Sequence, residues 1–134
     1  MSTPFGPRLI GETEKTLNAL LVRFLDGTGL TEPQWVVLRL ADANGGSAGA
    51  EELVATVADR AHFTDAAALV DELTARGLLE DGRLTPAGHD VTDAVLARSA
   101  TDTAPIWADL PPDDVAAAAR LLNEIVSRAR VVLG

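Results

Sequence analysis

Cysteine and tyrosine are absent from this chain of 134 residues, and phenylalanine and tryptophan together supply only 4% of it. Without cysteine there can be no disulfide, no thiol redox sensor and no zinc–thiolate site. No apolar run approaches the roughly 20 residues that cross a bilayer, so we expect no membrane association. Apolar residues still make up 47% of the chain, which suits one folded domain with a real core.

Targeting, catalytic and cofactor motifs are scarce as well. Residues 1–7 lack the charged region and apolar stretch of a secretory signal, so we expect a cytoplasmic protein. There is no glycine-rich phosphate loop, and His62 and His89 belong to no cluster with metal-ligand spacing. Neither histidine has a serine or aspartate partner at a motif spacing. We therefore predict no enzymatic activity, no cofactor and no metal site.

Basic residues are also in short supply. The chain has 11 Lys and Arg against 20 Asp and Glu, a net charge of −9. Residues 31–86 hold four basic and ten acidic side chains, a net charge of −6, whereas residues 1–30 are neutral. A nucleic-acid-binding protein uses Lys and Arg to displace phosphate counterions, so it would need a local basic surface here.

Helical spacing is clear in the first half of the chain. Residues 7–26 place apolar side chains at helical intervals, and glycines follow them. Thr31 can cap a second helix, with Gln34 at the capping-box position. After a glycine break, Ser47 can cap a third helix. The apolar side of the second helix is expected to comprise Trp35, Val36, Leu38 and Leu40.

A fourth helix and a hairpin follow in close succession. We predict the helix over Asp65–Arg76, with Thr64 as its cap, Gly77 as its stop and Arg76 interacting with its dipole. Two short helices that meet at a tight turn are typical of a helix-turn-helix. The Asp81-Gly82 pair predicts a two-residue turn between very short strands, because both positions tolerate positive φ. A hairpin placed there is a wing.

The remaining chain predicts two long helices. Thr85-Pro86 can begin one that runs to about Trp107, and Pro111-Pro112 can begin the last. In the last helix, apolar residues recur every three or four positions. This seam comprises Val115, Ala118, Leu122, Ile125, Ala129 and Val132. It can pack within the monomer or join the first helix in a subunit interface. We favour the interface, because a narrow seam on a terminal helix suits pairing.

Three stretches resemble the MarR family of bacterial regulators, namely Gly29–Trp35, Leu73–Leu78 and Leu84–Gly88. The similarity covers nearly the whole chain in order. It implies a mostly α fold with a small β-hairpin, in which residues 31–86 form a winged helix-turn-helix domain. Residues 8–27 and 87–134 would then be dimerisation helices. The resemblance also implies a homodimer that binds double-stranded DNA at a palindromic operator and responds to a small aromatic or phenolic effector.

The resemblance supplies two sets of candidate site residues. The candidate DNA contacts are Thr31, Gln34, Arg60, Thr64, Asp65, Ala67, Ala68 and Arg83. The candidate effector contacts are Phe24, Trp35, Arg39, His89 and Trp107. Arg60 and Arg83 would contact phosphates. Arg39 would pair with an effector carboxylate.

The chain departs from the family where DNA contacts are expected. Its wing is cut to a two-residue turn, and Ala67, Ala68 and Glu72 occupy positions that usually carry polar contacts. Alanine cannot hydrogen-bond a base edge and at best touches a thymine methyl. A second interpretation is therefore a winged-helix dimer that has lost strong DNA binding and acts as a small-molecule or protein-binding module. A third places ligand binding or catalysis in the dimer cleft.

Overall fold

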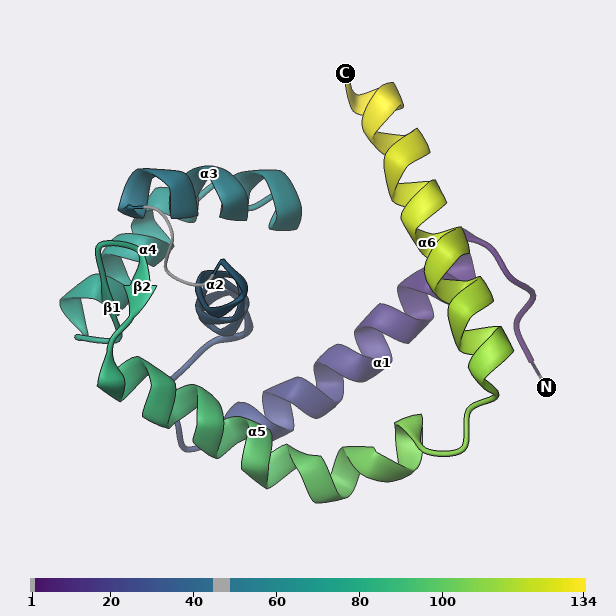
Figure 1. The fold of residues 1–134 in the computed structure, drawn as a ribbon, viewed down its shortest axis with the longest axis horizontal. Helices are drawn as coiled ribbons and strands as arrows, with labels where there is room; N and C mark the ends of the chain where they lie inside the picture. Colours follow the sequence, from purple (N-terminus) through teal and green to yellow (C-terminus); the bar gives the residue numbers. More distant parts are fainter. Residues whose placement is uncertain (1, 45–48) are drawn as a thin grey trace. The chain divides into compact units, whose positions relative to one another are not determined.

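The computed structural model describes residues 2–44 and 49–134. Their elements, in chain order, are α1 (Pro7–Leu25), α2 (Glu32–Ala43), α3 (Ala50–Ala61), α4 (Ala66–Ala75), β1 (Leu79–Glu80), β2 (Arg83–Leu84), α5 (Pro86–Trp107) and α6 (Pro112–Leu133) (Figure 1). This mostly helical architecture with one small hairpin confirms the predicted fold class. The chain divides into two compact units, Met1–Ser99 and Ala100–Gly134, with the boundary inside α5.

Local capping signals explain where several elements begin and end. Thr31 and Gln34 form a complete capping box at the start of α2, as predicted. The hydroxyl of Thr85 accepts a hydrogen bond from the Gly88 N–H over 3.0 Å in the first turn of α5. At the end of α4, the N–H of Gly77 bonds the carbonyl of Thr74, and the next N–H bonds the carbonyl of Leu73. That pair of bonds is a Schellman motif, so the predicted stop at Gly77 is confirmed.

The starts of α3 and α4 differ from the prediction. Ser47 lies outside the described residues, and α3 begins after Gly49, which has no side chain to accept a capping bond. The prediction that Thr64 caps the next helix is wrong. Asp65 occupies the N-cap position of α4 without a side-chain capping bond, and Thr64 lies in the preceding turn. Polar residues of similar capping ability stand side by side here, and the turn geometry selects between them.

The core lies in the first unit, where α2 contacts α1, α3, α4 and β2. Because α2 is surrounded in this way, it is buried over a wide face. Trp35 and Leu38 are buried as predicted, but Val36 and Leu40 are only half-buried. The fully buried Val37 and Ala41 take their place, which corrects the predicted apolar side. The buried residues that α3, α4 and the hairpin add are Leu53, Val57, Ala66, Leu69, Val70, Leu73 and Leu79.

The hairpin is short and pressed against the helices. Leu79 pairs with Leu84 and Glu80 with Arg83 in antiparallel register. Asp81 and Gly82 have φ values of 52° and 77°, as the predicted two-residue turn requires. A Cβ at Gly82 would lie 2.8 Å from the carbonyl oxygen of Gly49, so the turn packs directly on the start of α3.

A second close approach joins the hairpin to α5. A Cβ built at Gly88 would collide with the carbonyl oxygen of Leu78. The Thr85 N–H donates to that same carbonyl over 3.1 Å, and the Thr85 hydroxyl donates to the carbonyl of Gly77 over 2.6 Å. The first turn of α5 is therefore fixed against the segment that ends α4 and begins the hairpin.

The second unit holds the end of α5 and all of α6. None of the residues of α6 is buried, and Ile125 alone among its predicted seam residues is half-buried. The exposed large apolar residues of this unit are Ile106, Trp107, Leu110, Val115, Leu121, Leu122, Val126, Val131, Val132 and Leu133. What covers the seam stays a prediction. Across the described ranges 2–44 and 49–134, we find no helix with the length and apolar character needed to cross a membrane.

Candidate nucleic-acid interface

The helix-turn-helix consists of α3, the turn at 62–65 and α4. His62 ends α3 in the left-handed conformation, at φ 58° and ψ 28°, which turns the chain sharply. The two helices pack on each other, with Leu53 and Val57 of α3 and Leu69 and Leu73 of α4 in one core cluster. This packing leaves the opposite face of α4 in solvent, where the second helix of such a motif meets DNA.

The solvent face of α4 carries acidic side chains and small ones. The exposed residues at its start and along its first two turns are Thr64, Asp65, Ala67, Ala68, Asp71 and Glu72, and the uncharged Thr74 and Ala75 are exposed at its end. Carboxylates repel phosphate, although they can accept a hydrogen bond from the amino group of cytosine. Alanine methyl groups can contact a thymine methyl. This face can therefore touch base edges, but it offers no positive charge to the backbone.

Arg76 lies at the C-cap of α4 and is bound within the protein. One of its terminal nitrogens donates to the carbonyl oxygen of Gly29 over 3.1 Å and to Oε1 of Gln34 over 3.5 Å. Nε2 of Gln34 in turn donates to a carboxylate oxygen of Glu72 over 3.3 Å. These bonds fasten the C-terminal end of α4 to the α1–α2 turn. From the sequence, Arg76 was expected to interact with its own helix dipole, and these long-range bonds were not predicted.

Two of the candidate DNA contacts already have partners inside the protein. The Thr31 hydroxyl accepts from the N–H of Gln34 over 3.3 Å, and Oε1 of Gln34 accepts from the N–H of Thr31 over 3.1 Å. A contact between either side chain and DNA would have to share these groups. Their first role is to hold the start of α2.

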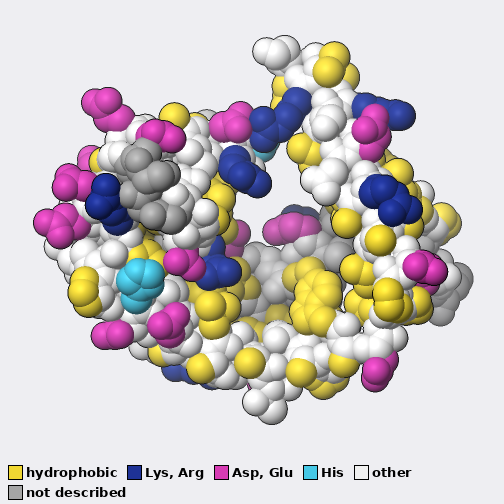
Figure 2. All heavy atoms as spheres, in the orientation of Figure 1, with side chains coloured by type: hydrophobic (Ala, Val, Ile, Leu, Met, Phe, Trp, Pro, Cys, Tyr) yellow, Lys and Arg dark blue, Asp and Glu magenta, His cyan; other side chains and the backbone are white. Residues whose placement is uncertain are grey.

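Arg60 and Arg83 are the candidate phosphate contacts, and both are exposed. Arg60 lies in the last turn of α3, and Arg83 lies on β2 opposite Glu80. Because Gly82 is buried against Gly49, the hairpin has no projecting tip. Figure 2 shows acidic side chains distributed over the part of the visible face that holds α3, α4 and the hairpin, with few basic side chains among them.

The five candidate effector contacts are not gathered into one cleft within the first unit. Phe24 and Trp35 are buried in the core, each less than a tenth exposed. The Arg39 guanidinium lies 5.9 Å from the centroid of the Trp35 ring and forms an ion pair with Asp42 at 3.2 Å. The other two candidates are exposed: His89 lies in the first unit and Trp107 in the second.

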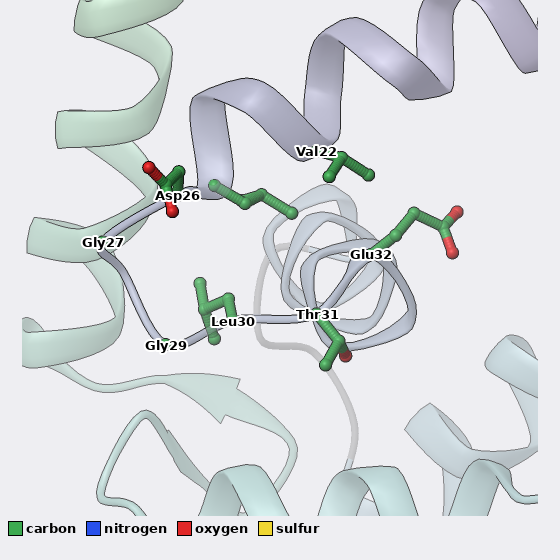
Figure 3. Close-up of a pocket in the computed structure, with 8 residues that line it drawn as sticks. Val22, Asp26, Gly27, Gly29, Leu30, Thr31 and Glu32 are labelled. Atoms are coloured by element: carbon green, nitrogen blue, oxygen red, sulfur yellow. The ribbon is translucent and has the colours of Figure 1, made fainter.

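An open pocket of about 460 Å³ lies at the α1–α2 turn instead (Figure 3). Its lining comprises Val22, Leu25, Asp26, Gly27, Gly29, Leu30, Thr31 and Glu32. None of the five candidate effector residues is in this lining. Arg98 of α5 supports the same turn, since it donates to the carbonyl oxygens of Phe24 and Asp26 over 3.1 and 3.0 Å. Neither this pocket nor the contacts of Arg98 were predicted from the sequence.

Comparison with known proteins identifies the class. A helix-turn-helix family matches residues 23–132, from the end of α1 almost to the end of α6. The protein therefore belongs to this helix-turn-helix family, and membership supports a DNA-binding role in transcription regulation. No curated protein and no solved structure matched the chain. Within the described residues, no three His, Asp or Glu side chains gather as a metal site would require.

Proposed function

We propose that this protein is a dimeric, MarR-like transcriptional regulator that places α4 in the major groove of a palindromic DNA site. The observation that carries the proposal is the solvent face of α4, directly after a helix-turn-helix turn and followed by a hairpin. The protein would act in the cytoplasm by binding and not by catalysis. The family match over residues 23–132 supports the DNA-binding part of this proposal.

The proposed subunit interface uses the helices outside the winged domain. Residues 8–27 and 87–134 would supply it, around residues 31–86 as the DNA-binding part. Its main support is α6, whose seam residues Val115, Leu122 and Val132 are exposed in the single chain. Covering such a row of apolar side chains with a second copy would remove them from water. Two copies related by a two-fold axis would present two α4 helices to two half-sites.

The proposed DNA contacts are few and mostly uncharged. Arg60 and Arg83 would meet phosphates, while Ala67 and Ala68 would touch thymine methyl groups. Asp65 would accept from a cytosine amino group. Each phosphate contact adds about 0.9 to the slope of log affinity against log salt. Two arginines from each of two protomers therefore give a magnitude of about 3 to 4, a shallow dependence for a regulator.

Ligand response is the finer part of the proposal. A small aromatic or phenolic effector would bind among Phe24, Trp35, Arg39, His89 and Trp107 once two copies associate. The cation–π geometry of Arg39 over Trp35 supports this set, because an arginine held beside an aromatic ring suits an aromatic acid.

A second function is favoured by a specific observation. Gln34 and Arg76 form hydrogen bonds within the protein, and the α4 face carries Asp65, Asp71 and Glu72. A winged-helix dimer that has lost strong DNA binding, and instead binds a small molecule or a protein, would have these features. The two proposals differ in whether the wild-type chain binds DNA at low salt.

A pull-down of fragmented genomic DNA by the full chain at low salt separates them. The regulator proposal expects recovery of a small set of fragments that share an inverted repeat. Recovery of no enriched fragment contradicts it and favours the second function. The control is an Asp65→Lys variant, whose added positive charge should raise non-specific recovery and thereby show that the assay detects weak binding.

A further inference from the structure

The pocket at the α1–α2 turn, defined above by its lining residues, is lined by apolar and acidic side chains, which indicate the class of ligand it would bind. Leu25 and Leu30 are almost fully buried in the core, whereas Val22 is 54% exposed. Asp26 and Glu32 bring two carboxylates, and the lining includes no Lys or Arg. In Figure 3 these two acidic residues lie on opposite sides of Val22 and Leu30. We infer that this pocket binds a small hydrophobic cation. Binding there would alter the position of α4, because Arg76 joins the end of α4 to the pocket.

Size and charge both support this ligand class. A volume of about 460 Å³ falls in the range of roughly 300–1,000 Å³ that small-molecule sites occupy. The apolar side chains would contact a hydrocarbon or aromatic body. Glu32 would attract its charged head, although screening by water keeps the pairing weak. The guanidinium groups of Arg76 and Arg98 reach the same turn, but each is hydrogen-bonded to a backbone carbonyl oxygen there.

The coupling path consists of hydrogen bonds to the pocket's own backbone. Gly29 lines the pocket, and its carbonyl oxygen accepts from Arg76 at the end of α4. Thr31 also lines the pocket, and its N–H donates to the same Gln34 oxygen that Arg76 contacts. A ligand that displaces the turn must therefore stretch or release the bonds that hold α4. This coupling rests on the proposed DNA-binding function, whereas binding in the pocket does not.

Binding is tested first, without DNA. The probe is benzyltrimethylammonium, with phenylacetate as an anion of similar size, and the readout is amide chemical shifts of the ¹⁵N-labelled chain. We expect saturable shifts at the amides of Gly27, Gly29 and Thr31 with the cation only. Glu32→Gln should weaken binding about two- to fivefold, as an exposed ion pair allows. Glu14→Gln, which removes an exposed carboxylate elsewhere on α1, should leave binding unchanged. Equal shifts with phenylacetate, or no effect of Glu32→Gln, overturn the assignment.

Coupling is tested next, with a DNA fragment from the pull-down. Saturating cation should change the DNA dissociation constant of the wild type at least about threefold, within the usual range of allosteric coupling. Arg76→Gln should abolish that change. Arg76→Lys keeps the charge but lacks the planar guanidinium, so it should reduce the effect of the cation without abolishing it. This variant also controls for a folding defect in Arg76→Gln. Binding of the cation with no change in DNA affinity overturns the coupling. If the wild type binds no DNA, the proposed function fails. The chemical-shift experiment still tests whether the pocket binds the cation.

Discussion

The guanidinium of Arg76 donates a hydrogen bond to the carbonyl oxygen of Gly29 over 3.1 Å, joining residues 47 positions apart. Arg76 lies at the end of α4, and Gly29 lies in the turn between α1 and α2. A basic residue of the helix expected to meet DNA is thus used to hold the domain together. The solvent face of α4 therefore carries Asp65, Asp71 and Glu72, while the arginine at its end is hydrogen-bonded to the α1–α2 turn.

Removing the Arg76 contact should lower stability. Arg76→Ala deletes the donor to Gly29 and Gln34, and we expect it to reduce the free energy of unfolding by about 1 kcal/mol. Urea unfolding followed by circular dichroism measures the change. Lys15→Ala removes an exposed cation of α1 and should stay within about 0.5 kcal/mol of the wild type. Equal effects of the two variants would show that the Arg76 bonds contribute nothing specific.

The close approach at Gly88 should tolerate no side chain. Gly88→Ala places a methyl group against the carbonyl of Leu78, and moving that backbone should cost about 1–3 kcal/mol. The matched control is Gly11→Ala, because Gly11 is inside α1 and an added Cβ there meets nothing within 4 Å. That change should raise stability by up to about 1 kcal/mol. Thermal unfolding of both variants checks the prediction, and a stable Gly88→Ala protein would contradict the packing described.

The α6 seam should carry the subunit interface. Leu122→Asp puts a charge on the seam, and burying it against a second copy should weaken the dimer at least about tenfold. Ser127→Asp adds the same charge to the same helix away from the seam and should leave association unchanged. Sedimentation equilibrium measures both. A wild type that is monomeric at high concentration would favour packing of the seam within one chain.

An arginine on the α4 face should add a phosphate contact. Ala68→Arg should strengthen DNA binding and make its salt dependence steeper by about 2, one contact from each protomer. Ala43→Arg makes the same change in charge at the exposed last residue of α2, outside the proposed interface helices, and serves as the control. Fluorescence anisotropy at several salt concentrations gives both slopes. Identical slopes for the two variants would show that α4 does not lie against the DNA.

Local signals were sufficient to predict the order of elements. The Thr31 capping box, the Gly77 stop and the Asp81-Gly82 turn each depend on residues only a few positions apart. Such signals report the backbone conformation that the nearby side chains favour. The Thr85-Pro86 and Pro111-Pro112 pairs likewise indicated where the two long helices begin, and the structure has them at Pro86–Trp107 and Pro112–Leu133.

Long-range contacts could not be predicted in the same way. The bonds of Arg98 join residues 72 and 74 positions apart, and nothing in the periodicity of α5 marks them. The burial of Val37 likewise depends on how many elements surround α2. The pocket at the α1–α2 turn arises from the folded turn and not from a motif. Which residues contact DNA or an effector stays a prediction for the same reason.

The proposed function requires that the wild-type chain bind DNA through α4. Its most direct test is the equilibrium affinity of the wild type for a recovered palindromic fragment, measured by anisotropy from low to physiological salt. We predict saturable binding at low salt that weakens with a slope of magnitude about 3 to 4 and is lost on shuffling the fragment. No binding by the wild type under conditions in which Ala68→Arg binds would contradict the claim.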